Sequence, residues 1–299
     1  MNFSVGICAY NEERNIGYLL ENILTHKTKH YLDEVIIVSS GSIDKTNEIV
    51  NNWVQKNKRI RLIIEPERKG KYSAVNLILA NNQSEILVMT DADCLLRDKA
   101  IDYLLPDFDK PKVGAVCGKT IPLNQKDTFW GYIADFRFRL FDHAAWEGTK
   151  KENFCHLSGY LYAIKKGLVD KIPAIIQDDL YIGHTIFSQG YKIYYEPHAV
   201  VNIMHPTSFK YLIRQRRRIR LGHLELQKLT GHHVSTTNPL LVIPAVLRHM
   251  DYTPLKIIYT LIVAFCEQYA VFLAKRDLKR GKIKLDWDYI EGSKKLKND

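Results

Sequence analysis

The first 120 residues alternate between short apolar runs and segments with helical periodicity. Strands are expected at 3–8, 34–39, 60–64, 86–91 and 113–118, with helices between them near 13–25, 44–57, 71–82 and 98–105. The Val-Ile-Ile-Val run at 35–38 is typical of a strand covered on both faces. This alternation predicts an α/β fold with a mostly parallel sheet flanked by helices. Such sheets bind ligands beyond the carboxyl ends of their strands.

Two carboxylates, Asp91 and Asp93, follow the apolar run that predicts the fourth strand. A bend just past a strand end can bring both onto one cation. Magnesium and manganese prefer oxygen ligands and commonly share them with a diphosphate. The pattern therefore predicts a site for a divalent metal and a diphosphate, and the alternative is a turn whose Asp residues cap the next helix.

The pattern changes after about residue 120. An aromatic helix is expected at 128–147, a strand around 158–164, a helix after Asp179, a strand around 192–196 and a basic helix over roughly 207–230. An aromatic stripe of this kind is typical of a core or an interface.

Charge is distributed unevenly along the chain. Residues 1–205 carry 25 Lys/Arg and 25 Asp/Glu, whereas residues 206–299 carry 18 and 8, which accounts for the whole net charge of +10. A neutral front and a basic rear indicate that the rear faces an anionic partner, either phospholipid, a lipid phosphate or nucleic acid, or presents a solvated basic face.

The five cysteines are scattered without metal-type or redox spacing, which favours a reducing compartment over a disulfide framework. The N-terminus enters a strand-like run at once, so no secretory signal is expected.

Six short stretches carry a family resemblance. They are Ala9-Tyr10-Asn11-Glu12-Glu13, Val38-Ser39-Ser40-Gly41-Ser42-Ile43-Asp44-Lys45-Thr46, Arg68-Lys69-Gly70-Lys71 with Ala74-Val75-Asn76, Asp91-Ala92-Asp93, Asp178-Asp179 and Gln215-Arg216-Arg217-Arg218-Ile219. In their order and separation they resemble the motifs of family-2 inverting nucleotide-sugar glycosyltransferases, which have a GT-A fold. The resemblance covers about residues 3–225.

The resemblance implies a nucleotide-sugar site and its residues. These are Ala9, Tyr10, Glu12, Ser39, Lys69, Gly70, Asp91, Gln215 and Arg218. Ser39 stands where the family usually has an Asp that binds uracil, so the resemblance defines the identity of the nucleobase less well. Five arginines within 214–220 cannot all face one diphosphate, because helical residues one or two apart point in different directions. Gln215 and Arg218 are predicted to bind the diphosphate.

The resemblance also implies the catalytic and metal-binding residues. Asp179 would be the general base for the acceptor hydroxyl, with Asp178 raising its proton affinity. Asp93 would be the principal ligand of a divalent metal, manganese or magnesium, assisted by Asp91. His205 is a candidate third ligand, although a lone His is more often a hydrogen-bonded structural residue.

The expected division of the chain follows from these motifs. Residues 1–205 would form the GT-A catalytic domain, with a nucleotide-binding half at about 1–120 and an acceptor half at about 121–205. Residues 206–299 would form a basic, apolar helical region. Ile219 replaces the Trp of the family motif, which weakens any assignment as a processive polymer synthase.

Two apolar segments mark the C-terminal region. The segment from Thr253 to Ala274 is long enough to span a bilayer, but Glu267 interrupts it. The segment at 239–247 is broken by Pro244. The pattern favours helices in the membrane interface, supported by the basic surroundings. The alternative is a soluble helical appendage or a dimer interface.

The combined expectation is a metal-dependent glycosyltransferase at the cytoplasmic side of the cell membrane. It would move a sugar from a nucleotide donor, with UDP favoured, to a lipid-linked or glycan acceptor. A sugar-phosphate nucleotidyltransferase and a non-enzymatic basic membrane adaptor are the alternatives. The basic residues show no signature of nucleic-acid binding.

Overall fold

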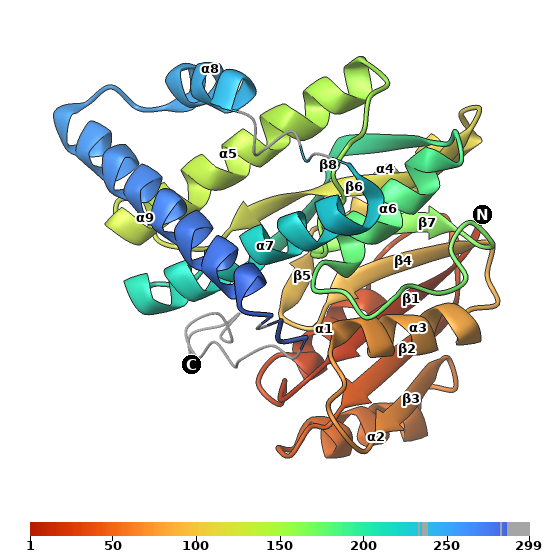
Figure 1. Ribbon diagram of the computed structural model, residues 1–299. Helices are drawn as coiled ribbons and strands as arrows, with labels where there is room; N and C mark the ends of the chain where they lie inside the picture. The colour runs from red at the N-terminus through yellow and green to blue at the C-terminus, as the bar shows by residue number, and fades with distance from the viewer. Residues whose placement is uncertain (233, 235–238, 282, 286–299) are drawn as a thin grey trace.

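The structure is a computed structural model that describes residues 1–232, 234, 239–281 and 283–285 (Figure 1). Its centre is an eight-stranded mixed sheet in the order β3-β2-β1-β4-β7-β6-β8-β5. The strands are β1 (Asn2–Ala9), β2 (Tyr31–Ser40), β3 (Ile60–Glu65), β4 (Ile86–Asp91), β5 (Cys94–Leu96), β6 (Val113–Pro122), β7 (Leu161–Lys165) and β8 (Lys192–Ile203). Helices lie on both faces of the sheet, as the sequence pattern predicted.

The nine α-helices of the described residues, together with one 3-10 turn, η1 (Pro106–Asp109), connect and cover these strands. They are α1 (Ile16–Leu24), α2 (Thr46–Lys56), α3 (Lys71–Asn81), α4 (Ala100–Leu104), α5 (Phe129–Lys150), α6 (Asp178–Ser188), α7 (Phe209–Thr230), α8 (Pro239–His249) and α9 (Pro254–Lys279).

The first half of the sheet is parallel and the second half is mixed. β1 pairs in parallel with β2 and β4, and β2 with β3. β7 is antiparallel to both β4 and β6, while β6 and β8 are parallel. The parallel pairing of β1, β2 and β4 places their carboxyl ends at one edge, which is where the candidate site lies.

Two layers of apolar side chains fill the space between sheet and helices. One layer contains the buried face of α1, formed by Ile16, Leu19, Leu20 and Ile23 at helical spacing. The other contains the inner faces of α3 and α6. Each large apolar side chain buried in these layers stabilises the fold by about 1.5–3 kcal/mol.

Most predicted elements are present, with two differences. β5 has three residues, too few to show a periodicity, and the sequence did not predict it. Pro244 was expected to break its segment, but it lies inside α8. The break was wrong because a proline removes one backbone hydrogen bond and can kink a helix without ending it.

The C-terminal helices form a separate layer at one side of the sheet, where α9 packs along α7 (Figure 1). The face of α9 toward the domain buries residues such as Val263, Ala270 and Leu273. Its opposite face leaves Leu261, Phe265 and Phe272 between 60% and 72% exposed. The helix therefore carries apolar side chains on two faces, one packed and one open.

Candidate active site

The loops after β1 and β2 hold each other in place through reciprocal hydrogen bonds. The Asn11 backbone N–H donates to Ser42 Oγ at 3.1 Å, and the Asn11 side chain accepts from the Ile43 N–H at 2.9 Å. Asn11 has a left-handed φ of 52°, a conformation that Asn tolerates better than most residues. Glu12 is buried, and its backbone N–H donates to Thr46 Oγ1 at 2.7 Å. This arrangement fixes the predicted Ala9–Glu12 segment.

The predicted base-binding residues lie around these loops. The Arg68 guanidinium lies over the Tyr10 ring at 3.6 Å from its centroid, a close cation–π contact. Ser39 is fully buried and donates to Ser42 Oγ at 2.9 Å, so it supports the loop. Ala9 is buried at the end of β1, and Lys69 is exposed just before α3.

Gly70 lies where only glycine fits. Its φ is 104°, and a Cβ there would lie 2.9 Å from the carbonyl oxygen of Leu285. Leu285, which follows α9 in the chain, therefore lies directly against the start of α3. This contact brings the C-terminal region to the predicted nucleotide site.

Asp91 ends β4, and Asp93 lies in the short turn before β5. Burial and the neighbouring Asp91 carboxylate raise the pKa of Asp93 to about 7. Burial also raises the pKa of Asp91, although Lys71 opposes this shift. Two adjacent carboxylates that resist ionisation fit a cation site, because a divalent ion would relieve their repulsion. The all-oxygen donor set suits magnesium or manganese.

Lys71 connects the two acidic motifs. Its Nζ lies 2.7 Å from Asp91 Oδ1 and 3.4 Å from Asp178 Oδ2, and its side chain is 15% exposed. Asp91 comes from β4 and Asp178 from the start of α6, so one lysine bridges strand and helix. Although its own burial opposes the charged form, Asp178 and Asp91 raise the pKa of Lys71 well above its usual value.

Asp179 is oriented by two backbone amides. The Gly159 N–H donates to Asp179 Oδ2 and the Leu180 N–H to Oδ1, each at 2.8 Å. A Cβ on Gly159 would meet both Asp179 Oδ2 and Lys71 Nζ at 3.2 Å, so these three groups are close neighbours. Burial, followed by the charge of Asp178, raises the pKa of Asp179 to about 7. A carboxylate with this pKa is suited to general-base chemistry near neutral pH.

A short segment ties Asp179 to the end of β4. Thr90 Oγ1 donates to the carbonyl oxygen of Tyr160 at 2.8 Å, and the adjacent Gly159 holds Asp179. Desolvation, followed by the negative charges of Asp93 and Asp91, raises the pKa of the Tyr160 hydroxyl. The carboxylates of the two acidic motifs, Asp91 with Asp93 and Asp178 with Asp179, therefore lie close together around Lys71 and form the acidic centre.

The arginines of α7 divide among several partners. Arg218 donates to the Ile176 carbonyl at 3.5 Å, and its positive charge lowers the pKa of Asp91. Arg217 pairs with Asp277, and Arg216 with Glu267. The expectation that these arginines cannot act together is consistent with this geometry. Gln215 Oε1 is buried and accepts no hydrogen bond within the described part of the chain.

The structure does not bring His205 together with Asp91 and Asp93. His205 Nε2 lies 2.8 Å from Arg137 Nη1, and Nδ1 lies 3.2 Å from the Pro206 carbonyl. Among the described residues no three Asp, Glu, His or Cys side chains gather as a metal-binding group. Ligation by His205 would require it to release Arg137, so its metal role stays a prediction.

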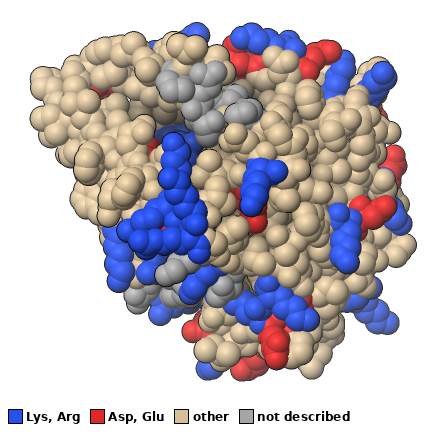
Figure 2. Space-filling model, viewed as in Figure 1, with Lys and Arg blue, Asp and Glu red and all other residues tan. Residues whose placement is uncertain are grey.

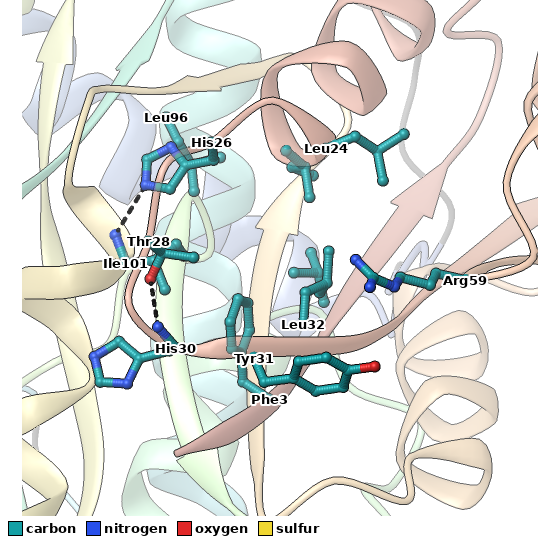
Figure 3. A pocket seen from close by; sticks show the side chains of 12 residues that line it. Phe3, Leu24, His26, Thr28, His30, Tyr31, Leu32, Arg59, Leu96 and Ile101 are labelled. Atoms are coloured by element: carbon teal, nitrogen blue, oxygen red, sulfur yellow. Dashed lines mark hydrogen bonds between the residues drawn. The ribbon is translucent and has the colours of Figure 1, made fainter.

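A separate pocket lies at the opposite edge of the sheet (Figure 3). It is lined by residues at the amino ends of β1 and β2, including Phe3 and Tyr31, and by His26 of the α1–β2 loop. No residue predicted for nucleotide, metal or catalysis lines it. The candidate active site is therefore defined by the acidic centre and not by this pocket.

Sequence reasoning did not assign roles to three residues that the structure places in the site. Arg68 and Lys71 lie inside a quoted motif, but only their position in space shows that they contact Tyr10 and the two carboxylates. Gly159 belongs to no motif, and a glycine near the start of the strand predicted around 158–164 was the one available signal.

Comparison with known proteins gives one family. The model of the family described as Glycosyl transferase family 2 matches residues 4–172, more than half of the chain. A probable glycosyltransferase of Bacillus subtilis, YdaM, is 28% identical over 229 residues, covering 74% of this chain and 54% of that protein. A poly-beta-1,6-N-acetyl-D-glucosamine synthase of Staphylococcus aureus is 27% identical over 231 residues, with the same coverage. The chain thus spans about half the length of these relatives.

A solved structure supports the fold. The mannosyltransferase PcManGT from Pyrobaculum calidifontis, in complex with GDP-Man and Mn2+, superposes with a TM-score of 0.65 at 22% identity. The match covers 94% of this chain and 88% of that chain. Together with the family match, it confirms the predicted GT-A fold.

Proposed function

Because the chain belongs to glycosyl transferase family 2, we propose that it is a metal-dependent inverting glycosyltransferase. It transfers a sugar from a nucleotide-sugar donor, with a UDP-sugar favoured, to a lipid-linked or glycan acceptor at the cytoplasmic face of the membrane. Residues 1–205 form the catalytic domain in this proposal, and residues 206–299 form the membrane-associated region.

One observation carries the proposal. Lys71 contacts both Asp91 and Asp178, so the acidic turn after β4 and the acidic start of α6 face one centre. A donor diphosphate near Asp91 and an acceptor hydroxyl near Asp179 would then be adjacent. Separate acidic motifs would have no reason to share a buried lysine if each merely capped a helix.

The chemical step follows from the position of Asp179. An acceptor hydroxyl attacks the anomeric carbon while the bond from that carbon to the nucleoside diphosphate breaks. The proton passes to Asp179, whose pKa of about 7 suits it to accept one. Asp178, through its charge, keeps that proton affinity high. Attack opposite the leaving group inverts the configuration.

Asp93 and Asp91 are the proposed ligands of a divalent metal, with His205 as a third only if it leaves Arg137. The ion, manganese or magnesium, would supply positive charge to the leaving diphosphate. Gln215 and Arg218 of α7 are proposed to contact the same diphosphate, because the Arg218 charge already acts on Asp91.

The base and ribose are proposed to lie over the loops after β1 and β2. The residues assigned to them are Ala9, Tyr10, Glu12, Ser39, Lys69 and Gly70. Arg68 covers the Tyr10 ring, so a base that stacks on Tyr10 would have to share or replace that contact.

The membrane assignment rests on α8 and α9. Within the described residues α9 is the one helix long and apolar enough to cross a membrane, but 33% of its apolar window is buried in the domain. Glu267 on its inner face pairs with arginines of α5 and α7. Figure 2 shows a largely uncharged surface over α8 and the first part of α9, beside a patch of Lys and Arg. We therefore favour helices that lie in the interface of an anionic membrane.

Binding of nucleotides to the full chain tests the proposal. The melting temperature would be measured with UDP, GDP and dTDP, each with and without manganese, for the wild type and Asp93→Ala. We expect at least one nucleotide to stabilise the wild type more in the presence of manganese, and Asp93→Ala to lose that increment. A donor-hydrolysis screen across nucleotide sugars would then identify the sugar.

Asp98→Ala is the matched control, since Asp98 is an exposed carboxylate shortly after the acidic turn. It should keep the manganese-dependent increment. A wild type that responds to none of the three nucleotides with manganese, or an Asp93→Ala protein that responds fully, would refute the proposal.

A further inference from the structure

A cluster of arginines lies between α5, α7 and α9, apart from the residues assigned to the donor. Arg137 of α5 and Arg216 and Arg220 of α7 surround Glu267 of α9. The guanidinium nitrogens lie 3.6, 2.5 and 3.1 Å, respectively, from the Glu267 carboxylate oxygens. The four side chains are between 13% and 18% exposed, so they are largely buried but reachable from solvent.

The charges of this cluster do not balance. Within the described residues, Glu267 is the one carboxylate paired with Arg137 and Arg216, so its single negative charge cannot neutralise both of them. Buried charges are costly unless they are paired, and guanidinium groups present planar donor forks that match phosphate oxygens. A surplus of arginine charge in a partly enclosed place is therefore suited to an anion, and to phosphate above all.

His223 gives an independent indication of a ligand. It is 5% exposed, and within the described part of the chain neither of its ring nitrogens has a hydrogen-bond partner. It lies one turn after Arg220 on α7. Burial, followed by neighbouring charges that include Arg220 and Arg216, lowers the pKa of its ring, and Glu267 opposes this shift. His156, whose ring centre is 5.8 Å away, also has a buried nitrogen without a partner. Buried polar groups are rarely left unsatisfied, and these nitrogens could donate to phosphate oxygens.

The surroundings of the cluster indicate which phosphate it would bind. Glu267 lies on α9, whose outer face exposes Phe265 and Phe272 to the proposed membrane interface. On the other side, Phe138, the residue after Arg137, packs edge-on against Tyr160 with ring centres 6.0 Å apart, and the Tyr160 carbonyl accepts from Thr90 at the end of β4, so the cluster borders the acidic centre. An anion held here would lie between apolar helix surface and the reacting groups.

We propose that Arg137, Arg216, Arg220 and His223 bind the phosphate of a lipid-linked acceptor. This inference rests on the proposed function, and it narrows the acceptor from any lipid-linked or glycan molecule to one that carries a phosphate or diphosphate beside the sugar or hydroxyl that is glycosylated. The apolar chain of the lipid leaves the cluster along α9.

Calorimetric titration of the full chain in detergent micelles tests the site. The probes are geranyl phosphate, geraniol and inorganic phosphate, and EDTA is present so that no metal at Asp91 and Asp93 contributes. We expect geranyl phosphate to bind at least about tenfold more tightly than either other probe. Arg137→Gln and His223→Phe should each weaken its binding about tenfold, because each removes donors to the anion.

The control is Arg139→Gln, on the same helix α5. Arg139 pairs with Asp135 and is 40% exposed, outside the cluster. It should change the affinity less than about twofold. A thermal melt of each variant identifies a loss of fold, and His223→Phe keeps the ion pairs of Glu267 in case Arg137→Gln unfolds.

Three results would overturn the inference. If geraniol binds as tightly as geranyl phosphate, the site does not recognise the phosphate. If inorganic phosphate binds as tightly, the site does not recognise the lipid chain. An equal loss in Arg139→Gln and Arg137→Gln would reduce the effect to general surface charge. Since no donor or metal is used, these outcomes are independent of the nucleotide experiment that tests the proposed function.

Discussion

Two buried charge clusters in this protein have opposite compositions. At the carboxyl edge of the sheet one lysine, Lys71, lies among carboxylates from β4 and α6. Between α5, α7 and α9 one carboxylate, Glu267, lies among three arginines. The first cluster has surplus negative charge and suits a cation, and the second has surplus positive charge and suits an anion. Each cluster contains one residue of the minority sign, which makes it tolerable in the absence of a ligand.

The pKa values follow the same contrast. Burial and neighbouring carboxylates raise the pKa of Asp179 and of Asp93 to about 7 each. Burial alone would raise the pKa of Glu267, but Arg216, Arg137 and Arg220 lower it to about 2. The comparison shows that the same depth of burial gives a proton acceptor in one place and a permanent charge in the other. The neighbours decide the difference.

The largest expected effect is on the acidic cluster. Asp179→Asn should lower kcat by about 10²- to 10⁴-fold, because it removes the proposed general base of the transfer. Nucleotide binding measured by thermal shift should persist. The exposed Asp170→Asn serves as control. A transfer rate within tenfold of the wild type would show that Asp179 is not the base.

The next effect is on the basic cluster. Glu267→Gln should lower the free energy of unfolding by about 3 kcal/mol, because it leaves three arginines without their shared carboxylate. Chemical denaturation measures this loss. The low pKa of Glu267 means that its contribution is present above its ordinary value of 4.5 and is lost as the pH falls toward about 2. A Glu147→Gln variant, which affects only the surface pair with Lys151, should change little, and equal losses would refute the prediction.

The apolar face beside the basic cluster should have a smaller effect. Phe265→Asp should weaken binding to vesicles that contain anionic lipid by about tenfold, since it removes one aromatic side chain from the face proposed to enter the membrane and adds a repelled charge. Co-sedimentation with vesicles measures this change. Ile43, 89% exposed in the loop after β2, supplies the control Ile43→Asp. Equal losses for the two variants would contradict a role for α9 at the membrane.

The smallest effect is a pH profile of the acidic cluster. As the proposed general base, Asp179 would act in its deprotonated form, so transfer should fall as the pH drops below its pKa of about 7. Between pH 7 and pH 6 the rate should fall about fivefold. The measurement uses saturating manganese, so that titration of Asp93 does not contribute. A flat profile from pH 8 to pH 6 would exclude this base.

The sequence predicted the elements of the fold better than their order. The apolar runs of β1 to β4 were contiguous and flanked by turn residues, so their positions follow from periodicity. The antiparallel insertion of β7 between β4 and β6 depends on pairings between distant segments, which no local pattern contains. The three-residue β5 was missed for lack of length.

The site was predicted in part. Asp91, Asp93, Asp178 and Asp179 were identified from motifs, and the structure gathers them around one lysine. That Lys71 joins them could not be read from the sequence, because residues of β4, α3 and α6 meet only in the folded chain. Glu267 was noted as an interruption of an apolar segment, and its arginine partners explain why it is there.

The antiparallel pairing of β4 with β7 joins two halves of the sheet of different character. Five residue pairs, from Ile86 with Lys165 to Thr90 with Leu161, form that seam. A chimaera that preserves these pairs could replace the later strands of this chain with those of a relative and keep β1 to β4 unchanged. The β4–β7 pairing is therefore a suitable boundary for exchanging the two halves of the sheet between related enzymes.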